Sequence, residues 1–279
     1  MYERFTIILS NWCNLRCPFC LQNATVNNGK EISAESLISF FESGKVAPKV
    51  FKLTGGEPLS PQVYEKTKKI VEYAISKGIR TQLNTNGTYK FTGDFDKELL
   101  NFQVSLDGLK EKHESLRGNG TFEKTVNFIK RVTKTGYKVN IMQVLQEETT
   151  RDEVEEFINF SVNEFNIHPK FQRMAPSGRA SGNKEVINID YDMDEFIENK
   201  GCSCRGVKYK CTTPEGKSTQ IGIDQHGNII PCPLLGKYKF GTIFNFNEFK
   251  IRQEISRKLK GCTCCYPDGY KGEVSFGHI

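Results

Sequence analysis

The sequence contains no hydrophobic run long enough to cross a membrane. The apolar run that opens the chain, Phe5 to Leu9, is far shorter than the roughly 20 apolar residues of a spanning helix. The residues before it, Met1-Tyr-Glu-Arg, lack the pattern of a secretory signal peptide. We therefore expect a cytoplasmic protein with no membrane partner.

The chain also lacks a cluster of positive charge. Its net charge is +6, but its Lys and Arg residues are scattered among 33 acidic residues, and no basic run carries interleaved aromatic residues. Because nucleic-acid binding requires such a basic patch, we do not expect nucleic acid as a partner. An apolar content of 37% and 20 Phe residues exclude a disordered chain.

Cysteine, in contrast, is plentiful and grouped. Ten Cys residues occur, and in a reducing compartment such clusters indicate metal binding rather than disulfides. The first group reads Cys13-Asn-Leu-Arg-Cys17-Pro-Phe-Cys20. Cysteine thiolates hold iron–sulfur clusters, and three thiols leave one iron of a four-iron cluster open. An open coordination position distinguishes a working metal site from a structural one.

Short apolar or alternating runs alternate with helical patterns along the first two thirds of the chain. This alternation predicts a parallel sheet with right-handed crossovers, and the polar or Gly-rich turns repeatedly follow a strand. Six repeats are too few to close an eight-stranded barrel. The expected fold is therefore α/β, an open, partial (β/α)6 TIM-like barrel. The predicted strands are 5–10, 50–53, 80–83, 102–106, 138–145 and 170–174.

Helix starts are predicted from capping residues. Ser60 followed by Pro61 indicates an N-cap and a first helical position. Thr121 is predicted to cap a later helix, and Thr150 with Glu153 forms a capping box. Beyond Arg179 the periodicity weakens and Cys residues multiply, which predicts a barrel domain over 1–178 and a small Cys-rich extension over 179–279.

A second motif, Gly55-Gly56-Glu57-Pro58, follows the second predicted strand. Together with the Cys13–Cys20 segment, which we call the Cys loop, it resembles the radical S-adenosylmethionine (radical SAM) superfamily. The Cys spacing alone would also suit half a zinc site. The resemblance implies that Cys13, Cys17 and Cys20 hold a [4Fe–4S] cluster that binds S-adenosylmethionine (SAM). It also implies that the Gly-Gly-Glu-Pro motif meets the SAM amino group, since glycines allow close approach and Glu57 can accept a hydrogen bond.

The resemblance extends to further candidate SAM contacts. Arg117 resembles a position that pairs with the SAM carboxylate, which suits a bidentate guanidinium. The alternative for these positions is turn chemistry or surface charge. Gln143 and Arg173 would face the same site only if the strand register is as expected. The other candidates are Phe19, Asn86, Ser105 and Asp107.

The tail resembles the SPASM or "twitch" extensions that carry auxiliary clusters, because Cys211, Gly227 and Cys232 have their spacing. Residues 223–232 are predicted to form a hairpin with His226-Gly227 at its turn. The Cys series stops after Cys262-Thr-Cys264-Cys265, which favours the shorter twitch type with one auxiliary [4Fe–4S] cluster. Cys202 or Cys204 could replace a ligand, and a zinc knot is the structural alternative. The expected ligands are Cys211, Cys232, Cys262 and Cys265.

The resemblance implies an enzyme that cleaves SAM reductively to a 5′-deoxyadenosyl radical, which abstracts a substrate hydrogen. It also implies an external one-electron donor of flavodoxin or ferredoxin type. The favoured substrate is a ribosomally made peptide that is cross-linked, epimerised or oxidised, with Cys202, Cys204 or Cys264 available to return a hydrogen atom. Against a peptide, the Cys loop begins at residue 13, which leaves no room for a preceding peptide-recognition domain.

Three alternatives remain open at this point. The first is two-electron oxidation of a small alcohol or sugar. The second, a molybdenum-cofactor enzyme, ranks lower because the tail Phe276-Gly-His-Ile279 lacks the Gly-Gly ending of that enzyme. The third is a non-enzymatic, zinc-binding structural or interaction protein.

Overall fold

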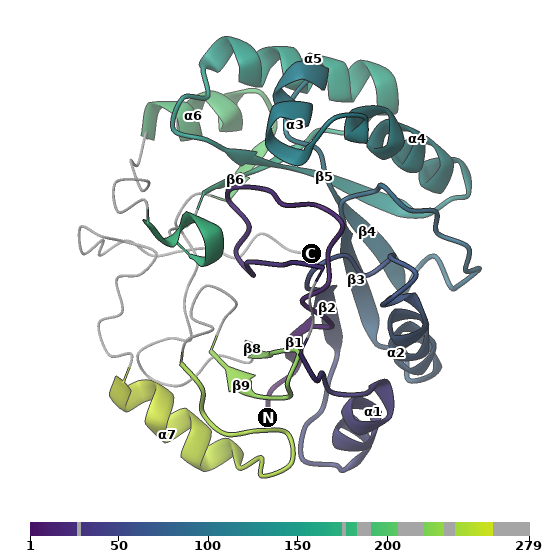
Figure 1. Ribbon diagram of the computed structural model, residues 1–279, viewed down its shortest axis with the longest axis vertical. Helices are drawn as coiled ribbons and strands as arrows, with labels where there is room; N and C mark the ends of the chain where they lie inside the picture. The colour runs from purple at the N-terminus through teal and green to yellow at the C-terminus, as the bar shows by residue number, and fades with distance from the viewer. Residues whose placement is uncertain (27–28, 175–176, 183–190, 206–219, 232–237, 259–279) are drawn as a thin grey trace.

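A computed structural model describes residues 1–26, 29–174, 177–182, 191–205, 220–231 and 238–258 (Figure 1). One nine-stranded sheet has the order β7-β6-β5-β4-β3-β2-β1-β8-β9, and every neighbouring pair is parallel except β8 with β9. The strands are β1 (Arg4–Ile8), β2 (Val50–Thr54), β3 (Arg80–Thr85), β4 (Leu100–Ser105), β5 (Lys138–Leu145), β6 (Lys170–Arg173), β7 (Ser203–Arg205), β8 (Gln220–Ile223) and β9 (Ile229–Ile230).

Helices cover the outside of this curved sheet, and the segment that follows β1, dark purple in Figure 1, lies on the inside of the curve. The predicted α/β partial barrel is therefore confirmed. A short 3-10 turn spans Gly178–Gly182. The helices are α1 (Ala34–Glu42), α2 (Tyr64–Ser76), α3 (Lys110–Arg117), α4 (Thr121–Lys134), α5 (Arg151–Phe165), α6 (Tyr191–Asn199) and α7 (Glu248–Lys258).

Alternate residues on each strand separate an apolar face under the helices from a polar inner face. Leu83 is in register with Phe102, and both are fully buried in the core. Their neighbours Gln82 and Gln103 point the other way, and the Gln82 amide donates to Gln103 Oε1 at 3.0 Å. The period of two in the sequence thus decides which side chains face the helices.

The same alternation shows that the expected placement of two residues is wrong. Gln143 is in register with Phe171, which packs against Phe157 of α5, so Gln143 lies on the helix-covered face. Arg173 lies outside the barrel as well, because its Nη2 donates to Asp194 of α6 at 2.8 Å. Neither side chain faces the inside of the sheet.

The helix starts were predicted with mixed success. The Thr150–Glu153 capping box is confirmed at the start of α5. The predicted caps at Ser60 and Thr121 are wrong, because a turn that uses the Ser60 carbonyl precedes α2 and the left-handed Gly120 precedes α4. Helix α3 was not predicted.

Strands from both sides of residue 179 belong to the same sheet. β7 extends it beyond β6, while β8 pairs with β1 in parallel, and the predicted hairpin is confirmed as β8 and β9. The two-domain division at residue 179 stays a prediction. No helix in the described parts of the chain is long and apolar enough to span a membrane.

Candidate active site at the carboxyl edge of the sheet

The sequence motifs gather at one edge of the sheet. The Cys loop follows β1, Gly55-Gly56-Glu57-Pro58 follows β2, Asn86 follows β3, and Asp107 follows β4. Because these four strands are parallel neighbours, their carboxyl ends meet. This is the edge at which barrel folds build active sites.

The two glycines of the second motif lie against the backbone that leads into the Cys loop. Gly56 N donates to Ser10 O at 2.7 Å. A Cβ atom on Gly56 would stand 1.8 Å from Trp12 O, and one on Gly55 would stand 2.5 Å from Ser10 O. Only glycine permits this approach, since any side chain would displace the Cys-loop backbone. The two glycines thus permit close packing of the Cys-loop backbone, and their expected approach to SAM stays a prediction.

Glu57 ties the end of β2 to the end of β3. Its side chain is 1% exposed. Oε1 accepts from Leu59 N at 2.9 Å and from Thr85 Oγ1 at 2.7 Å, and Oε2 accepts from Asn86 N at 2.8 Å. Burial raises the pKa of Glu57, and these hydrogen bonds oppose that shift. Its acceptors are thus largely committed to protein donors in this structure.

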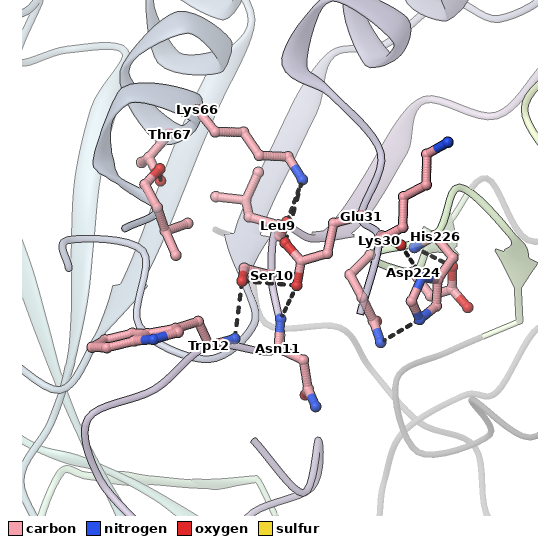
Figure 2. Close-up of polar contacts among 12 residues, drawn as sticks. Leu9, Ser10, Asn11, Trp12, Lys30, Glu31, Lys66, Thr67, Asp224 and His226 are labelled. Atoms are coloured by element: carbon pink, nitrogen blue, oxygen red, sulfur yellow. Dashed lines mark hydrogen bonds and ion pairs between the residues drawn. The ribbon is translucent and has the colours of Figure 1, made fainter. Parts of the chain in front are cut away.

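Pro58, the last residue of the motif, connects the motif to α2. Its carbonyl accepts from Thr67 Oγ1 at 2.8 Å, and Thr67 is shown in Figure 2 beside the start of the Cys loop. Thr67 is buried on the face of α2 that packs on the sheet. Helix α2 therefore anchors the motif through the hydrogen bond from Thr67.

Each sulfur of the Cys loop receives an N–H donor. Cys17 is buried, while Cys13 and Cys20 are partly exposed. Hydrogen bonds from protein N–H groups are a common outer shell of metal-bound thiolates, so the donor set suits an iron–sulfur cluster. The donor–sulfur distances are 3.4 Å from Leu15 N to Cys13, 3.5 Å from Ala24 N to Cys20 and 3.9 Å from Arg117 Nη1 to Cys17.

The thiols of Cys13 and Cys17 are not poised to ionise by themselves. Burial raises the pKa of Cys13 to about 12 and also raises that of Cys17. A cluster's positive irons are what deprotonate such thiols. In the described residues, no three His, Cys, Asp or Glu side chains already surround a common metal position. A four-iron cluster is held differently, because each of the three thiolates binds a different iron and the sulfurs need not surround one position.

Arg117, on the last turn of α3, joins the Cys loop to the end of β4. Its Nε donates to Asp107 Oδ2, and its guanidinium carbon lies 5.4 Å from the centre of the Phe19 ring. Burial lowers the pKa of Arg117, but Asp107 and Cys17 outweigh this and raise it overall. The guanidinium is thus a fixed charge beside the cluster loop.

Asp107 is fully buried and has a second task. Its Oδ1 accepts from Val144 N at 2.7 Å, so it links β4 to β5 as well as to Arg117. Its backbone N–H donates to His113 Nδ1 at 3.0 Å. Burial lowers the pKa of His113 to about 4, so this imidazole is neutral. Sequence reasoning missed His113, although its spacing of four from Arg117 on one helix face was a usable signal.

Asn86 and Ser105 complete the edge. Asn86 Nδ2 donates to Asn14 Oδ1 at 3.1 Å and lies 4.0 Å from Cys13 Sγ, so it contacts the Cys loop directly. Ser105 is the last residue of β4 and is half-buried at the same edge. The structure brings these residues to the site, while their contacts with SAM stay a prediction.

The second Cys group is only partly described. Cys211, Cys232, Cys262, Cys264 and Cys265 lie outside the described residues.

Cys204 lies in β7, in register with Phe171. Cys202 precedes β7, and its Sγ is 3.8 Å from Nδ1 of His168, which precedes β6. Cys202 therefore lies at the amino end of β7, away from the carboxyl edge that carries the Cys loop, whereas Cys204 lies within β7. That position disfavours Cys202 as a hydrogen donor at the motif edge.

Residues 7–161 match the Radical SAM superfamily. Among curated relatives, GTP 3′,8-cyclase of Clostridium perfringens is 31% identical over 66% of this chain and 59% of its own length. The sporulation killing factor maturation protein SkfB of Bacillus subtilis is 27% identical over 67% of this chain and 46% of its own length. The mycofactocin maturase MftC of Mycolicibacterium smegmatis is 24% identical over 91% and 72%. The matched segments thus span about half to three fifths of the first two of these relatives.

Solved structures agree on the fold. Streptococcus suis SuiB bound to the precursor peptide SuiA superposes with a TM-score of 0.70 at 16% identity, covering 95% of this chain and 67% of SuiB. The family implies a [4Fe–4S] cluster and SAM, and the three-Cys loop lies where the sheet gathers the other motifs. This chain belongs to the radical SAM superfamily.

Proposed function

We propose that this radical SAM enzyme modifies a peptide. Two of the relatives carry names of maturation enzymes, and the similarly folded SuiB binds a precursor peptide, which is the observation that carries the proposal. The bond formed, whether a cross-link, an epimerised centre or an oxidation, is left open by these relatives. Oxidation of a small alcohol or sugar remains the alternative.

The residues of the Cys loop suit the cofactor that the family implies. Cys13, Cys17 and Cys20 would hold the cluster, and bound cluster and SAM together supply a carbon radical that takes hydrogen from an unactivated C–H bond. The protein itself would orient the bound cofactor and substrate and shield the radical from other groups. Arg117 and Asn86 place donors beside the sulfurs of Cys17 and Cys13, which favours their thiolate form.

The auxiliary cluster is a separate part of the proposal. We assign it to Cys211, Cys232, Cys262 and Cys265 because of the twitch-type spacing, with an external flavodoxin- or ferredoxin-type protein as electron donor. Its role would be to relay an electron or to shape the substrate site.

Iron content and SAM cleavage test the proposal. Anaerobically purified protein should be brown, contain iron and sulfide for about two [4Fe–4S] clusters, and cleave SAM when reduced with dithionite. Cys17→Ala should abolish SAM cleavage, whereas Cys262→Ala should retain some cleavage and lose product formation. Colourless, zinc-loaded protein would contradict the enzyme proposal and support a structural zinc site.

A reaction on a nucleotide is a further candidate beside the peptide and the small alcohol or sugar, because the chain is 31% identical to a GTP 3′,8-cyclase. The peptide and nucleotide candidates differ in which substrate gives its hydrogen atom to the radical. GTP should increase 5′-deoxyadenosine formation only if a nucleotide is the substrate, whereas a precursor peptide should do so if the peptide proposal is correct.

A further inference from the structure

Residues 29–33, which we call the strap, connect the segment after the Cys loop to α1, and the β8–β9 hairpin holds the strap at two backbone positions. His226 Nδ1 lies 3.0 Å from Lys30 O, and Ile32 N donates to Gln225 O at 2.9 Å. A carbonyl can only accept, so Nδ1 of His226 carries the proton. The Gln225 amide then donates to the other ring nitrogen at 3.2 Å, which fixes the ring orientation.

The hairpin turn is a firm support for these bonds. Asp224 Oδ1 accepts from the backbone N–H groups of His226 at 2.9 Å and Asn228 at 2.8 Å. Gly227 has a φ of +83°, and a Cβ atom there would stand 2.9 Å from Ile32 Cδ1. The buried Ile32 side chain therefore rests directly on the turn.

Between these two anchored positions, Glu31 reaches to the Cys loop (Figure 2). Its Oε1 accepts from Ser10 Oγ at 2.9 Å and from Asn11 N at 2.8 Å. Ser10 Oγ in turn accepts from Trp12 N at 2.9 Å. One carboxylate oxygen thus organises the backbone immediately before Cys13.

Lys66 of α2 completes the arrangement. Its Nζ donates to Leu9 O and lies 4.0 Å from Glu31 Oε2, and both charged side chains are largely buried, at 15% and 16% exposed. Charge-assisted hydrogen bonds at sites with little water are stronger than exposed ones. Glu31 is therefore held from the side of the hairpin and from the side of the sheet.

We propose that the β8–β9 hairpin positions the Cys loop through the strap, with Glu31 as the positioning residue. The inference rests on the proposed function in one respect, namely that the loop so positioned holds the SAM-binding cluster. The hairpin would then set the geometry of the first cluster from the C-terminal part of the chain. A shift of the turn would move Glu31 and, with it, the backbone of Ser10 to Trp12.

Amide hydrogen exchange measures this coupling without cofactor chemistry. In Glu31→Ala, exchange in a peptide covering 9–13 should speed up by about tenfold, because two hydrogen bonds to one buried acceptor are lost. His226→Ala should speed up the same peptide by about threefold, although the residue is remote in sequence. His226→Asn should restore protection, since its amide can donate to Lys30 O.

The matched control is Glu35→Ala. Glu35 pairs with Lys69 between α1 and α2 at 2.6 Å, but both side chains are exposed and neither touches the Cys loop. Exchange in 9–13 should stay at the wild-type rate in this variant. In cluster-loaded protein, Glu31→Ala and His226→Ala should each raise the Kd for SAM by at least about threefold, with Glu35→Ala unchanged.

The outcomes separate this inference from the proposed function. Exchange in 9–13 that is unchanged in both Glu31→Ala and His226→Ala overturns the inference. Faster exchange in Glu31→Ala alone overturns the role of the hairpin. Wild-type protein that takes up no iron–sulfur cluster refutes the proposed function, and the exchange data then still decide whether the hairpin positions the loop.

Discussion

The polar side chains at this site form hydrogen bonds and ion pairs mainly with one another. Asp107 is the clearest case, because its carboxylate binds Arg117 and Val144 N while its own N–H is accepted by His113. Asp107 and His113 are fully buried and the Arg117 side chain is 8% exposed, so removing one partner would leave another charge or dipole unpaired. The charged groups next to Cys17 are therefore held in one orientation before any ligand arrives.

His113 predicts a pH dependence of stability. Its pKa is lowered from 6.5 to about 4 by burial and by Arg117, so in the folded protein it resists protonation while the unfolded chain binds a proton near pH 6.5. Stability from this group is complete above pH 6.5 and is lost as pH falls toward 4. Roughly 2 kcal/mol should be lost between pH 7 and pH 5.

Urea denaturation at both pH values compares wild type with His113→Asn. The Asn side chain can still accept from Asp107 N but does not titrate, so its stability should fall less on acidification. Equal losses in the two proteins would show that His113 does not carry this pH dependence.

Gly56→Ala tests the close approach beneath the Cys loop. Because the new Cβ would meet Trp12 O at 1.8 Å, the loop backbone must shift. We expect a loss of about 2–4 kcal/mol in unfolding free energy together with loss of SAM cleavage. Gly29→Ala is the matched control, since no atom of the described residues lies within 4 Å of its Cβ position. Full activity in Gly56→Ala would contradict the proposed constraint.

At the scale of elements, the helices fall into two groups by what they touch. Helices α2 and α3 reach the motif edge, through Lys66 and Thr67 on one and Arg117 on the other. Helix α5 packs on the outside through Phe157 and begins with its own capping box. A change that destabilises α5 should therefore leave SAM cleavage by the folded protein unchanged.

Thr150→Ala should destabilise the protein by about 1 kcal/mol, because Thr150 Oγ1 no longer accepts from Glu153 N. Thr150→Ser keeps the hydroxyl and should remain close to wild type. SAM cleavage measured below the unfolding transition should be equal in all three proteins. A loss of cleavage in Thr150→Ala would link α5 to the active site.

For the whole molecule, one sheet carries strands from both ends of the chain. β8 pairs with β1, and Ile221 and Ile223 of β8 are fully buried in the same core as Phe5 and Ile7. The strand that precedes the Cys loop is therefore stabilised from both sides. Unfolding the described part of the C-terminal region should unfold the barrel with it.

Trp12, the only Trp in the sequence, reports on this cooperativity from the position immediately before the Cys loop. Urea transitions followed by its fluorescence and by far-UV circular dichroism should coincide. Ile223→Ala should shift both together, at a cost of about 2–5 kcal/mol, whereas Phe249→Ala, which is 76% exposed, should shift neither. Fluorescence that changes at lower urea would show that the Cys loop unfolds separately.

Residue patterns were enough to predict the repeated strand–helix order, the motif loops at strand ends and the resemblance of the Cys loop to a known family motif. Those features depend on spacings of two to four residues, which periodicity and capping report directly. Cys13, Gly56 and Asp107 could be placed at one edge because parallel strands bring their ends together.

The groups that these motifs contact are set by the folded chain and could not be predicted. Gln143 lies outside the barrel because of strand register, Gly56 serves the Cys-loop backbone, and Arg117 is paired with Asp107. Glu31 and His226 join segments that no local pattern connects, since His226 and Lys30 stand 196 positions apart. Such contacts follow from how loops cross the edge of a folded sheet, and short-range propensities carry no information about that path.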